Sequence, residues 1–275
     1  MFIDTHTHIH QHDRDETSDI VNRAIASKVG AIITAGVNIE DSRQAIRVAE
    51  QYDPVFAGIG VHPTSLTSPL LDQDIADLDD MAGSSQVVVM SEIGIDHQER
   101  SPDRTWQENA FRSQITLAHD HGLALIFHAR EDGDDYDAHS ARDTIIDILK
   151  NENAGELGGV AHYFQGRWSH AKRFLDMGFH ISFAKTLIRI PDLEETAQKT
   201  PSDRILLETD SYPQPFKKKR EKWTEPRDLP LIAEKLAALR DTSVEEIARI
   251  TKGNTLKLFG SRSQFVNAVL EPPLR

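Results

Sequence analysis

The chain has 275 residues, of which 39% are hydrophobic, so it is long enough to bury a full core within one domain. Its formal net charge of −13 argues against a broad basic surface that wraps duplex nucleic acid, while a strand end held at a metal site is compatible with it. Cysteine is absent, which excludes disulfides and thiolate ligands and leaves nitrogen and oxygen to bind any metal.

No targeting or membrane segment is apparent. The chain runs from Met1 directly into an apolar strand pattern, without the basic and apolar stretches of a signal peptide, and no uncharged apolar run approaches about 20 residues. We therefore expect a soluble, cytoplasmic protein that makes no membrane contact and folds as one domain over residues 1–275. The tail from about residue 270 contains Pro272 and Pro273, cannot continue a helix and is expected to be mobile. The sequence does not indicate an oligomeric state.

Eight short apolar runs alternate with helical patterns, and eight is the number of strands in a closed parallel barrel. The strands are predicted over residues 1–5, 31–35, 55–61, 87–93, 124–128, 160–163, 179–183 and 205–209. This pattern predicts an α/β fold, a (β/α)8 TIM barrel, with a metal site at the C-terminal ends of the strands.

The segments between the strands have helical spacing. Helices are predicted over residues 18–29, 41–52 and 103–121, the last with Phe111, Ile115 and Ala118 on one face. After the eighth strand, further helices are predicted from Pro230 and from Ser243, the latter with Thr242 and Glu245 in the register of a capping box. We expect these two helices to close the barrel.

Six potential metal ligands fall at the predicted strand ends. His6 and His8 are two residues apart, so on a strand they point the same way and can bind one cation. Glu92, His128, His162 and Asp210 come at or just after the ends of later strands, and a barrel of this kind brings those ends together. The ligand set is therefore His6, His8, Glu92, His128, His162 and Asp210.

Four imidazoles and two carboxylates are more ligands than one tetrahedral ion needs. They fit two divalent ions, Zn²⁺, Mn²⁺ or Mg²⁺, with Glu92 as the bridge between them. Two such ions about 3.5 to 4 Å apart activate a bridging water and stabilise attacking and leaving oxygens, which indicates hydrolysis. Asp210 is the predicted general base and Glu92 the other catalytic residue.

Two further carboxylates lie on the same strand faces. Asp4 is either an acceptor that orients a histidine or a structural carboxylate below the site. Glu208 points to the same side as Asp210 and, inside a barrel, an ionised carboxylate needs a partner. We predict a structural role for Glu208.

Seven short motifs follow one another along nearly the whole sequence: FIDTHTH from Phe2, GVHP from Gly60, SEIGID from Ser91, FHAR from Phe127, HYFQG from His162, LLETD from Leu206 and NTLKLF from Asn254. In these motifs and in their order the chain resembles the TatD-type metal-dependent deoxyribonucleases of the amidohydrolase superfamily. The resemblance implies a (β/α)8 barrel, a site for two divalent ions and phosphodiester hydrolysis from DNA ends.

The chain departs from the family pattern in loops that would shape the substrate pocket. It has His62-Pro63-Thr64 where the family commonly has His-Pro-His, His97 where an aromatic residue is usual, and Ser211-Tyr212-Pro213 where Ala-Pro follows the last aspartate. His62, at the end of the third strand, is predicted to contact substrate. Arg130, just past the fifth strand, is predicted to do the same.

A dense basic segment, Lys217, Lys218, Lys219 and Arg220, follows the eighth strand in an otherwise acidic chain. Such a run is usually a solvated loop face. Here its position near Asp210 also favours a role at the rim of the site, where the cations bind phosphates while Trp223, Trp168 or Tyr163 stacks a base. Arg167 could add to this rim.

Three functional hypotheses follow. The first is a two-metal hydrolase that acts on phosphodiesters, most plausibly as a DNA exonuclease whose partner is a DNA end. The second keeps the metals but changes the substrate to a small amide, lactone or phosphate ester, because barrel loops vary independently of the metal core. The third is a metal-binding protein without turnover, which the presence of Asp210 disfavours.

Overall fold

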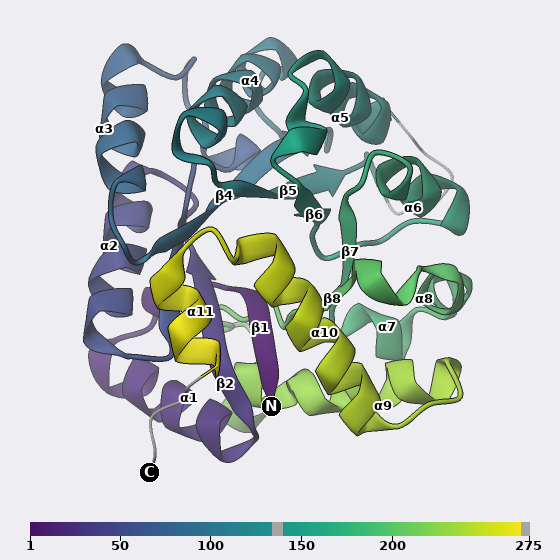
Figure 1. The fold of residues 1–275 in the computed structure, drawn as a ribbon. Helices are drawn as coiled ribbons and strands as arrows, with labels where there is room; N and C mark the ends of the chain where they lie inside the picture. Colours follow the sequence, from purple (N-terminus) through teal and green to yellow (C-terminus); the bar gives the residue numbers. More distant parts are fainter. Residues whose placement is uncertain (134–139, 271–275) are drawn as a thin grey trace.

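The computed structural model describes residues 1–133 and 140–270, and across these ranges eight parallel strands form one sheet in the order β1 to β8 (Figure 1). The strands are β1 (Phe2–Thr7), β2 (Val29–Ala35), β3 (Val55–Ile59), β4 (Val87–Asp96), β5 (Ala124–Arg130), β6 (Gly159–Ala161), β7 (His180–Phe183) and β8 (Ile205–Leu207). Helices connect them, so the predicted (β/α)8 barrel is confirmed. The expectation for the tail falls on residues 271–275, outside the described part of the chain.

Most helices surround the sheet and begin at short polar caps. The side chains of Asp13, Asn38 and Asp103 accept hydrogen bonds from backbone N–H groups in the first turns of their helices, which would otherwise lack partners. The helices are α1 (Arg14–Ala26), α2 (Ile39–Gln51), α3 (Asp72–Ala82), α4 (Arg104–His121), α5 (Ser140–Asn151), α6 (Trp168–Leu175), α7 (Thr186–Arg189), α8 (Glu194–Lys199), α9 (Leu229–Leu239), α10 (Val244–Phe259) and α11 (Ser263–Leu270).

Several predicted boundaries were wrong for local reasons. Val29 begins β2 and does not end α1, because Lys28 has a left-handed φ of 64° that stops the helix. The sixth strand ends before Tyr163, whose φ of 44° lies outside the β region. The cap of α10 is Ser243, which accepts from the N–H of Glu246, so the predicted capping box at Thr242 is one residue too early.

The barrel closes where its last strand, β8, lies against its first strand, β1. The N–H of Asp210 donates to the carbonyl of His6 at 2.9 Å, and that of His8 donates to Ser211 at 2.7 Å. Buried Asp4 accepts from both the backbone N–H and the hydroxyl of Thr209. Asp4 is therefore the structural carboxylate of the two alternatives, and it joins the first strand to the last.

Two apolar layers hold the barrel together. One lies between the strands and the surrounding helices, and the other fills the barrel interior. The interior layer, which includes Ile33 and Phe56, continues into Phe265 and Val269 of α11. In Figure 1, α10 and α11 lie across the viewer's side of the strands and cover this end of the barrel. Of the two helices predicted to close the barrel, the one from Ser243 is therefore in place as α10, and its partner there is α11 and not the helix from Pro230, α9. The opposite end, where the strands terminate, is left for the site.

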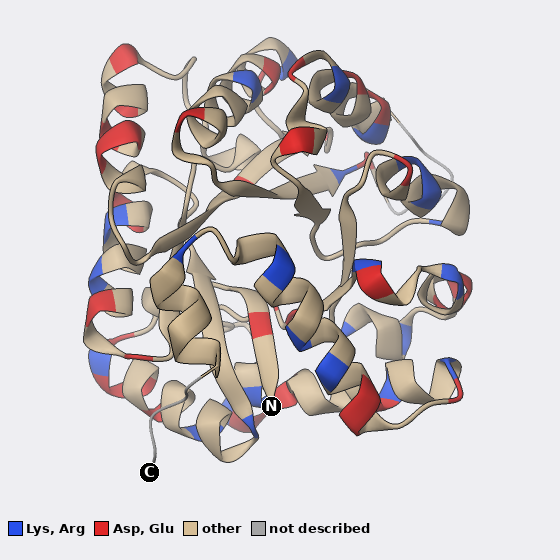
Figure 2. Cartoon of the chain, in the orientation of Figure 1, with Lys and Arg blue, Asp and Glu red and all other residues tan. Residues whose placement is uncertain are grey.

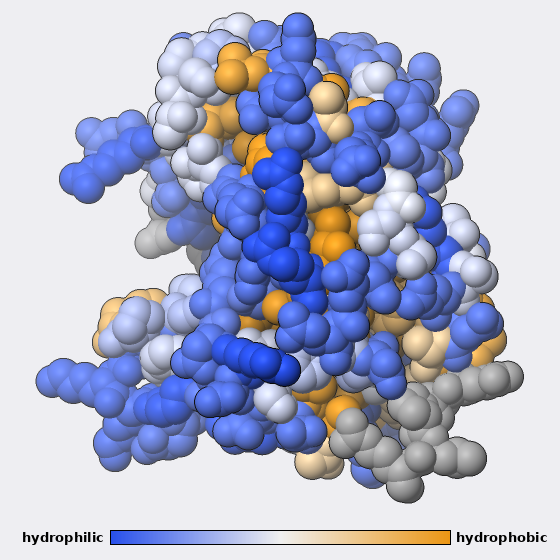
Figure 3. All heavy atoms as spheres, turned by 90° about the vertical axis from the view of Figure 1, so that its left-hand side faces the viewer, coloured by the Kyte–Doolittle hydropathy of each residue, from blue (hydrophilic) through white to orange (hydrophobic). Residues whose placement is uncertain are grey.

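The outer surface carries both signs of charge. Figure 2 shows acidic and basic residues interspersed along the surrounding helices. Figure 3 shows a mostly hydrophilic face over α1, α2 and α3, with apolar side chains visible only between the polar ones. Among the described residues, no helix is both long and apolar enough to cross a bilayer.

Candidate metal centre

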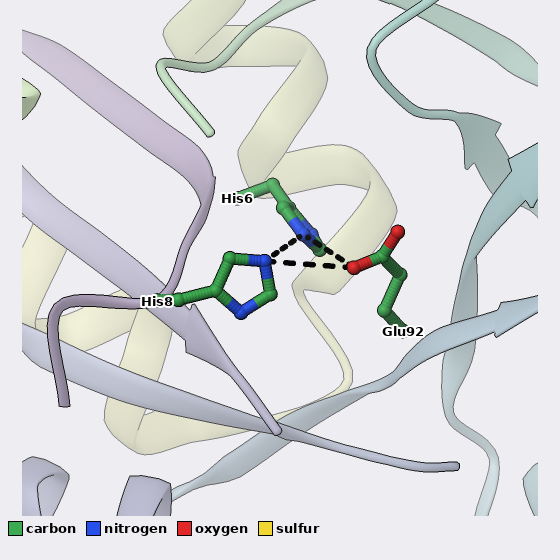
Figure 4. Close-up of side chains that lie close together, drawn as sticks. All are labelled: His6, His8 and Glu92. Atoms are coloured by element: carbon green, nitrogen blue, oxygen red, sulfur yellow. Dashed lines mark hydrogen bonds and ion pairs between the residues drawn. The ribbon is translucent and has the colours of Figure 1, made fainter. Parts of the chain in front are cut away.

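Side chains from β1, β4 and the segment after β8 converge at the C-terminal end of the barrel. The Nε2 atoms of His6 and His8 lie 3.3 Å apart, and each faces Oε2 of Glu92, at 3.4 and 3.5 Å respectively (Figure 4). Oδ1 of Asp210 lies 3.4 Å from Nε2 of His8 and 3.8 Å from Nε2 of His6. The ligand atoms of His6, His8 and Glu92 thus lie within 4.8 Å of one another, and those of His6, His162 and Asp210 form a second such cluster that shares His6.

This spacing fits a metal ion. Two ligand atoms that bind Zn²⁺ at about 2.1 Å and at a tetrahedral angle lie about 3.4 Å from each other. The separation between the two histidine nitrogens, and their separations from the oxygens of Glu92 and Asp210, range from 3.3 to 3.8 Å. The donor set also fits, because imidazole and carboxylate are common ligands of divalent ions.

A second group of nitrogen atoms faces the other oxygen of Glu92. Nε2 of His162 lies 2.8 Å from Oε1, and Nδ1 of His128 lies 3.2 Å from it. Nε2 of His62 is also close to Oε1, at 3.3 Å. The two oxygens of Glu92 thus face two different sets of histidines.

The remaining ring nitrogen of four of these five histidines, all except His62, contacts an acceptor outside the centre. Nδ1 of His8 contacts the carbonyl of Ala35 at 2.7 Å, Nε2 of His128 contacts Asp96 at 2.9 Å, Nδ1 of His162 contacts Glu208 at 3.1 Å, and Nδ1 of His6 contacts the hydroxyl of Ser91 at 3.4 Å. An acceptor on the outer nitrogen fixes the proton there and leaves the inner nitrogen free to bind a cation.

The electrostatics of the centre favour positive charge. Burial lowers the pKa of His8, but hydrogen bonds to the carboxylates of Asp210 and Glu92 outweigh it and raise that pKa to about 10. Burial raises the pKa of Glu92, yet the surrounding histidines, His62 and His162 foremost, hold it well below the usual range. Both pKa shifts show that the negative charges of Glu92 and Asp210 favour positive charge on the groups around them.

The backbone contributes to the placement of Asp210. This residue follows β8 with a left-handed φ of 51°, a conformation that costs a non-glycine residue about 1 to 2 kcal/mol. The turn directs the carboxylate toward His6 and His8, across the seam between β8 and β1. The structure thus brings together all six residues that the sequence predicted as ligands.

A cavity of about 600 Å³ opens above this centre. Its lining includes the predicted substrate contacts His62 and Arg130, together with Tyr163 and Tyr212. The predicted basic segment, Lys217 to Arg220, is not part of the lining. Arg220 pairs with Glu16 and with buried Glu225, so its charge is already neutralised within the fold.

Two carboxylates, Asp96 and Glu208, contact the outer nitrogens of metal-site histidines, and the sequence did not predict these contacts. Asp96 received no role, although it is four residues after Glu92 and the even spacing puts both on one face of a strand. Glu208, for which a structural role was predicted, contacts Nδ1 of His162 and the backbone N–H of Tyr163, and this partner was not predicted. Both carboxylates orient a histidine of the centre.

Comparison with known proteins agrees with this architecture. A family model described as TatD related DNase matches residues 3–260. The "uncharacterized metal-dependent hydrolase YabD" of Bacillus subtilis is 34% identical over 94% of this chain and 99% of its own length. The "3'-5' ssDNA/RNA exonuclease TatD" of Klebsiella pneumoniae is 31% identical over 91% of this chain and 94% of its own. The crystal structure of the TatD homologue YjjV from Escherichia coli superimposes with a TM-score of 0.82 at 28% identity, covering 94% and 98% of the two chains.

Proposed function

The chain belongs to the TatD-related DNase family and is therefore a metal-dependent hydrolase, and from this premise we propose that it hydrolyses phosphodiester bonds at the end of a DNA strand with two divalent ions. One observation carries the proposal. The two oxygens of Glu92 face separate sets of histidines, as a carboxylate that bridges two ions must do.

His6, His8 and Asp210 would hold one ion, and His128 and His162 the other, with Glu92 between them. Zn²⁺, Mn²⁺ and Mg²⁺ all accept carboxylate ligands, and the four imidazoles favour Zn²⁺ or Mn²⁺ by intrinsic affinity. When bound, such ions lower the pKa of a coordinated water and polarise the phosphoryl oxygen.

Asp210 is suited to act as the general base. Burial raises its pKa, but its hydrogen bond to His8 and the charges of His162 and His8 bring the pKa below the ordinary value, so the carboxylate is ionised at neutral pH. About a fifth of the side chain is exposed, and Asp210 lines the cavity. The carboxylate can therefore reach an attacking water and accept its proton.

His62 is positioned to donate to a phosphate oxygen. Its Nδ1 accepts a hydrogen bond from the backbone N–H of Thr64 at 3.2 Å, so the ring proton is on Nε2, which faces the centre. Arg130 lines the same cavity from the end of β5. A guanidinium at this place suits the planar, bidentate binding of a phosphate.

The size and charge of the cavity favour a strand end over uninterrupted duplex. Pockets for small ligands have volumes of about 300 to 1,000 Å³, and this cavity lies within that range. The chain also has a net charge of −13, so it lacks the overall positive field that binds long duplex. The printed name of the Klebsiella relative, an exonuclease of single-stranded DNA and RNA, agrees with such a substrate.

The proposal is tested with metal-stripped protein and end-labelled single-stranded DNA across a series of divalent ions. The variant Asp210→Asn should lose stepwise shortening of the strand by about a thousandfold or more, as expected when the general base and a ligand are lost together. Asp241→Asn is the matched control, because Asp241 is an exposed aspartate with a similar left-handed φ of 48°. That variant should retain full activity.

Stepwise shortening that requires both metal and Asp210 supports a DNA exonuclease. If no ion promotes cleavage while the protein binds close to two equivalents of metal, the phosphodiester proposal fails and a small amide, lactone or phosphate ester becomes the substrate to seek. Cleavage that Asp210→Asn leaves intact contradicts the assigned base.

A further inference from the structure

Two aromatic side chains are exposed on the segment that follows β8. Phe216 is 68% exposed and Tyr212 is 37% exposed, and their ring centroids lie 6.5 Å apart. Tyr212 also lines the metal cavity, whereas Phe216 lies outside it. An aromatic ring exposed to water lacks the stabilisation that burial provides, so a pair of exposed rings beside the site is an unusual surface feature.

The aromatic residues that the sequence suggested for base stacking are less available. The ring of Trp223 is covered by the guanidinium of Arg220 at 4.6 Å, and its indole N–H donates to the carbonyl of Lys217. Trp168 packs against the apolar layer outside the barrel and lies under Lys199. Tyr163, the third suggested residue, is part of the cavity wall and is not among the exposed aromatic residues. Within residues 1–133 and 140–270, Tyr212 and Phe216 are the large aromatic side chains that are exposed.

The segment that carries this pair is anchored at its base. Gln214 is 4% exposed, and its side-chain oxygen accepts from the backbone N–H of Thr224 at 3.1 Å and from the ammonium of Lys217. Arg220 ties the next part of the segment to Glu225 and to Glu16 of α1. These contacts hold the segment in place while the two rings remain in solvent.

Positive charge flanks the two rings. Lys218 and Lys219 are exposed, and within residues 1–133 and 140–270 neither forms an ion pair. Arg189, which ends α7, is also exposed. Burial raises the pKa of Tyr163 and lowers the pKa of Lys217. The positive charge of Arg189 lowers the pKa of both groups, so Arg189 lies near both.

We propose that Tyr212 and Phe216, flanked by Arg189, Lys218 and Lys219, bind the unpaired nucleotides that adjoin the strand end in the metal cavity. The bases stack on the two rings, and the phosphates pair with the flanking cations. The proposal rests on the proposed function and deepens it, since stacking on a side chain requires a base free of its complement. It assigns single-stranded nucleic acid as the ligand class of this surface.

The separation of the rings is consistent with a base between them. Stacked planes are about 3.4 Å apart, so one base between two rings needs about 6.8 Å. The rings of Tyr212 and Phe216 are 6.5 Å apart and tilted by 40°. The exposed Phe216 ring is free to rotate on a fast timescale.

The test compares substrates of different length with metal-loaded enzyme. The measured quantity is the length advantage, the ratio of kcat/KM for a single-stranded 20-mer to kcat/KM for a dinucleotide. Phe216→Ala should reduce the length advantage about five- to a hundredfold, through a higher KM for the 20-mer, because one lost stacking contact has this effect. Phe216→Trp should preserve it. Leu270→Ala truncates another exposed apolar side chain, at the covered end of the barrel, and serves as the matched control.

Fluorescence anisotropy of a labelled 20-mer on the Asp210→Asn background measures binding independently of turnover. Weaker binding of Phe216→Ala that Phe216→Trp restores supports the proposal, even if the parent enzyme cleaves no phosphodiester and the proposed function fails. If Phe216→Leu binds and cleaves the 20-mer as well as the parent does, the ring is not a stacking surface and the proposal is overturned. Equal length advantage in Phe216→Ala and the parent overturns it as well.

Discussion

Asp96 accepts a hydrogen bond from Nε2 of His128 at 2.9 Å, and this contact turns Nδ1 of the same ring toward Glu92. Burial raises the pKa of Asp96, but hydrogen bonds from His128 and Ser101 outweigh it and bring the pKa to about 2. The carboxylate is therefore ionised at all ordinary pH values. It fixes which nitrogen of His128 can bind a cation.

Replacing Asp96 by asparagine should weaken metal binding about ten- to a hundredfold, because the amide lacks the charge that orients the histidine. Calorimetric titration of metal-stripped protein with Mn²⁺ or Zn²⁺ measures the change. Asp79→Asn is the matched control, since Asp79 contacts Nε2 of His121 at 2.7 Å on the surface, away from the cavity. Equal affinity in the two variants would remove the orienting role of Asp96.

The seam between β1 and β8 should be sensitive to one hydroxyl group. Thr209→Val removes the donor to buried Asp4 while keeping the shape of the side chain, and should lower the free energy of unfolding by about 1 to 3 kcal/mol. Urea denaturation measures this difference. Thr116→Val removes an exposed hydroxyl that bonds only to its own helix, and a change of similar size there would contradict the assignment.

His180 should make the fold sensitive to acid. Burial, aided by the charge of Arg204, lowers its pKa to about 4, while in the unfolded chain its pKa is near 6.5. Between pH 6.5 and 4 the unfolded state therefore binds a proton that the folded state does not, and stability falls as the pH decreases. From pH 7 to 5 the loss due to His180 should be about 2 kcal/mol.

The comparison that isolates this effect is urea unfolding of the parent and of His180→Gln at pH 7 and pH 5. The variant should lose less stability than the parent over the same interval. Parallel losses in the two proteins would show that His180 does not remain neutral in the fold.

Glu225 should be important for stability because it is buried among three cations. Its carboxylate pairs with Arg23, Arg220 and Arg227, and the side chain is only 3% exposed. Glu225→Gln removes the shared anion, while the guanidinium groups stay about a third exposed and Arg23 and Arg220 keep Glu16, so it should cost about 1 to 3 kcal/mol in thermal or chemical unfolding. Glu221→Gln, an exposed substitution in the same segment, should change stability by less than about 0.5 kcal/mol.

The ligand positions could be predicted because barrel geometry depends on short-range patterns. His6 and His8 have the two-residue spacing of one strand face, and each later ligand follows an apolar run. Asp96 could not be assigned in the same way, since the predicted strand ended at Ile93. In the structure β4 continues to Asp96 because it pairs with the extended end of β5, as far as Arg130.

Whether the cations of the basic segment are free or paired depends on residues that are distant in the sequence. Arg220 is a free cation by composition, but in the fold it contacts Glu16, about two hundred residues earlier in the chain, and Glu225. The exposure of Phe216 likewise could not be predicted from its residue type, which is usually buried. The contact between Arg220 and Glu16 forms because the segment between β8 and α9 packs against α1.

The closure of the barrel between β1 and β8 determines when the protein becomes active during synthesis. A nascent chain has its first histidines from the beginning, but it acquires Asp210, and the strand that holds it against His6 and His8, only after three quarters of the chain have been made. Most of the chain is therefore translated before the ligand set is complete. A chain that stops before this point lacks both the Asp210 carboxylate and the contacts that join it to the first strand.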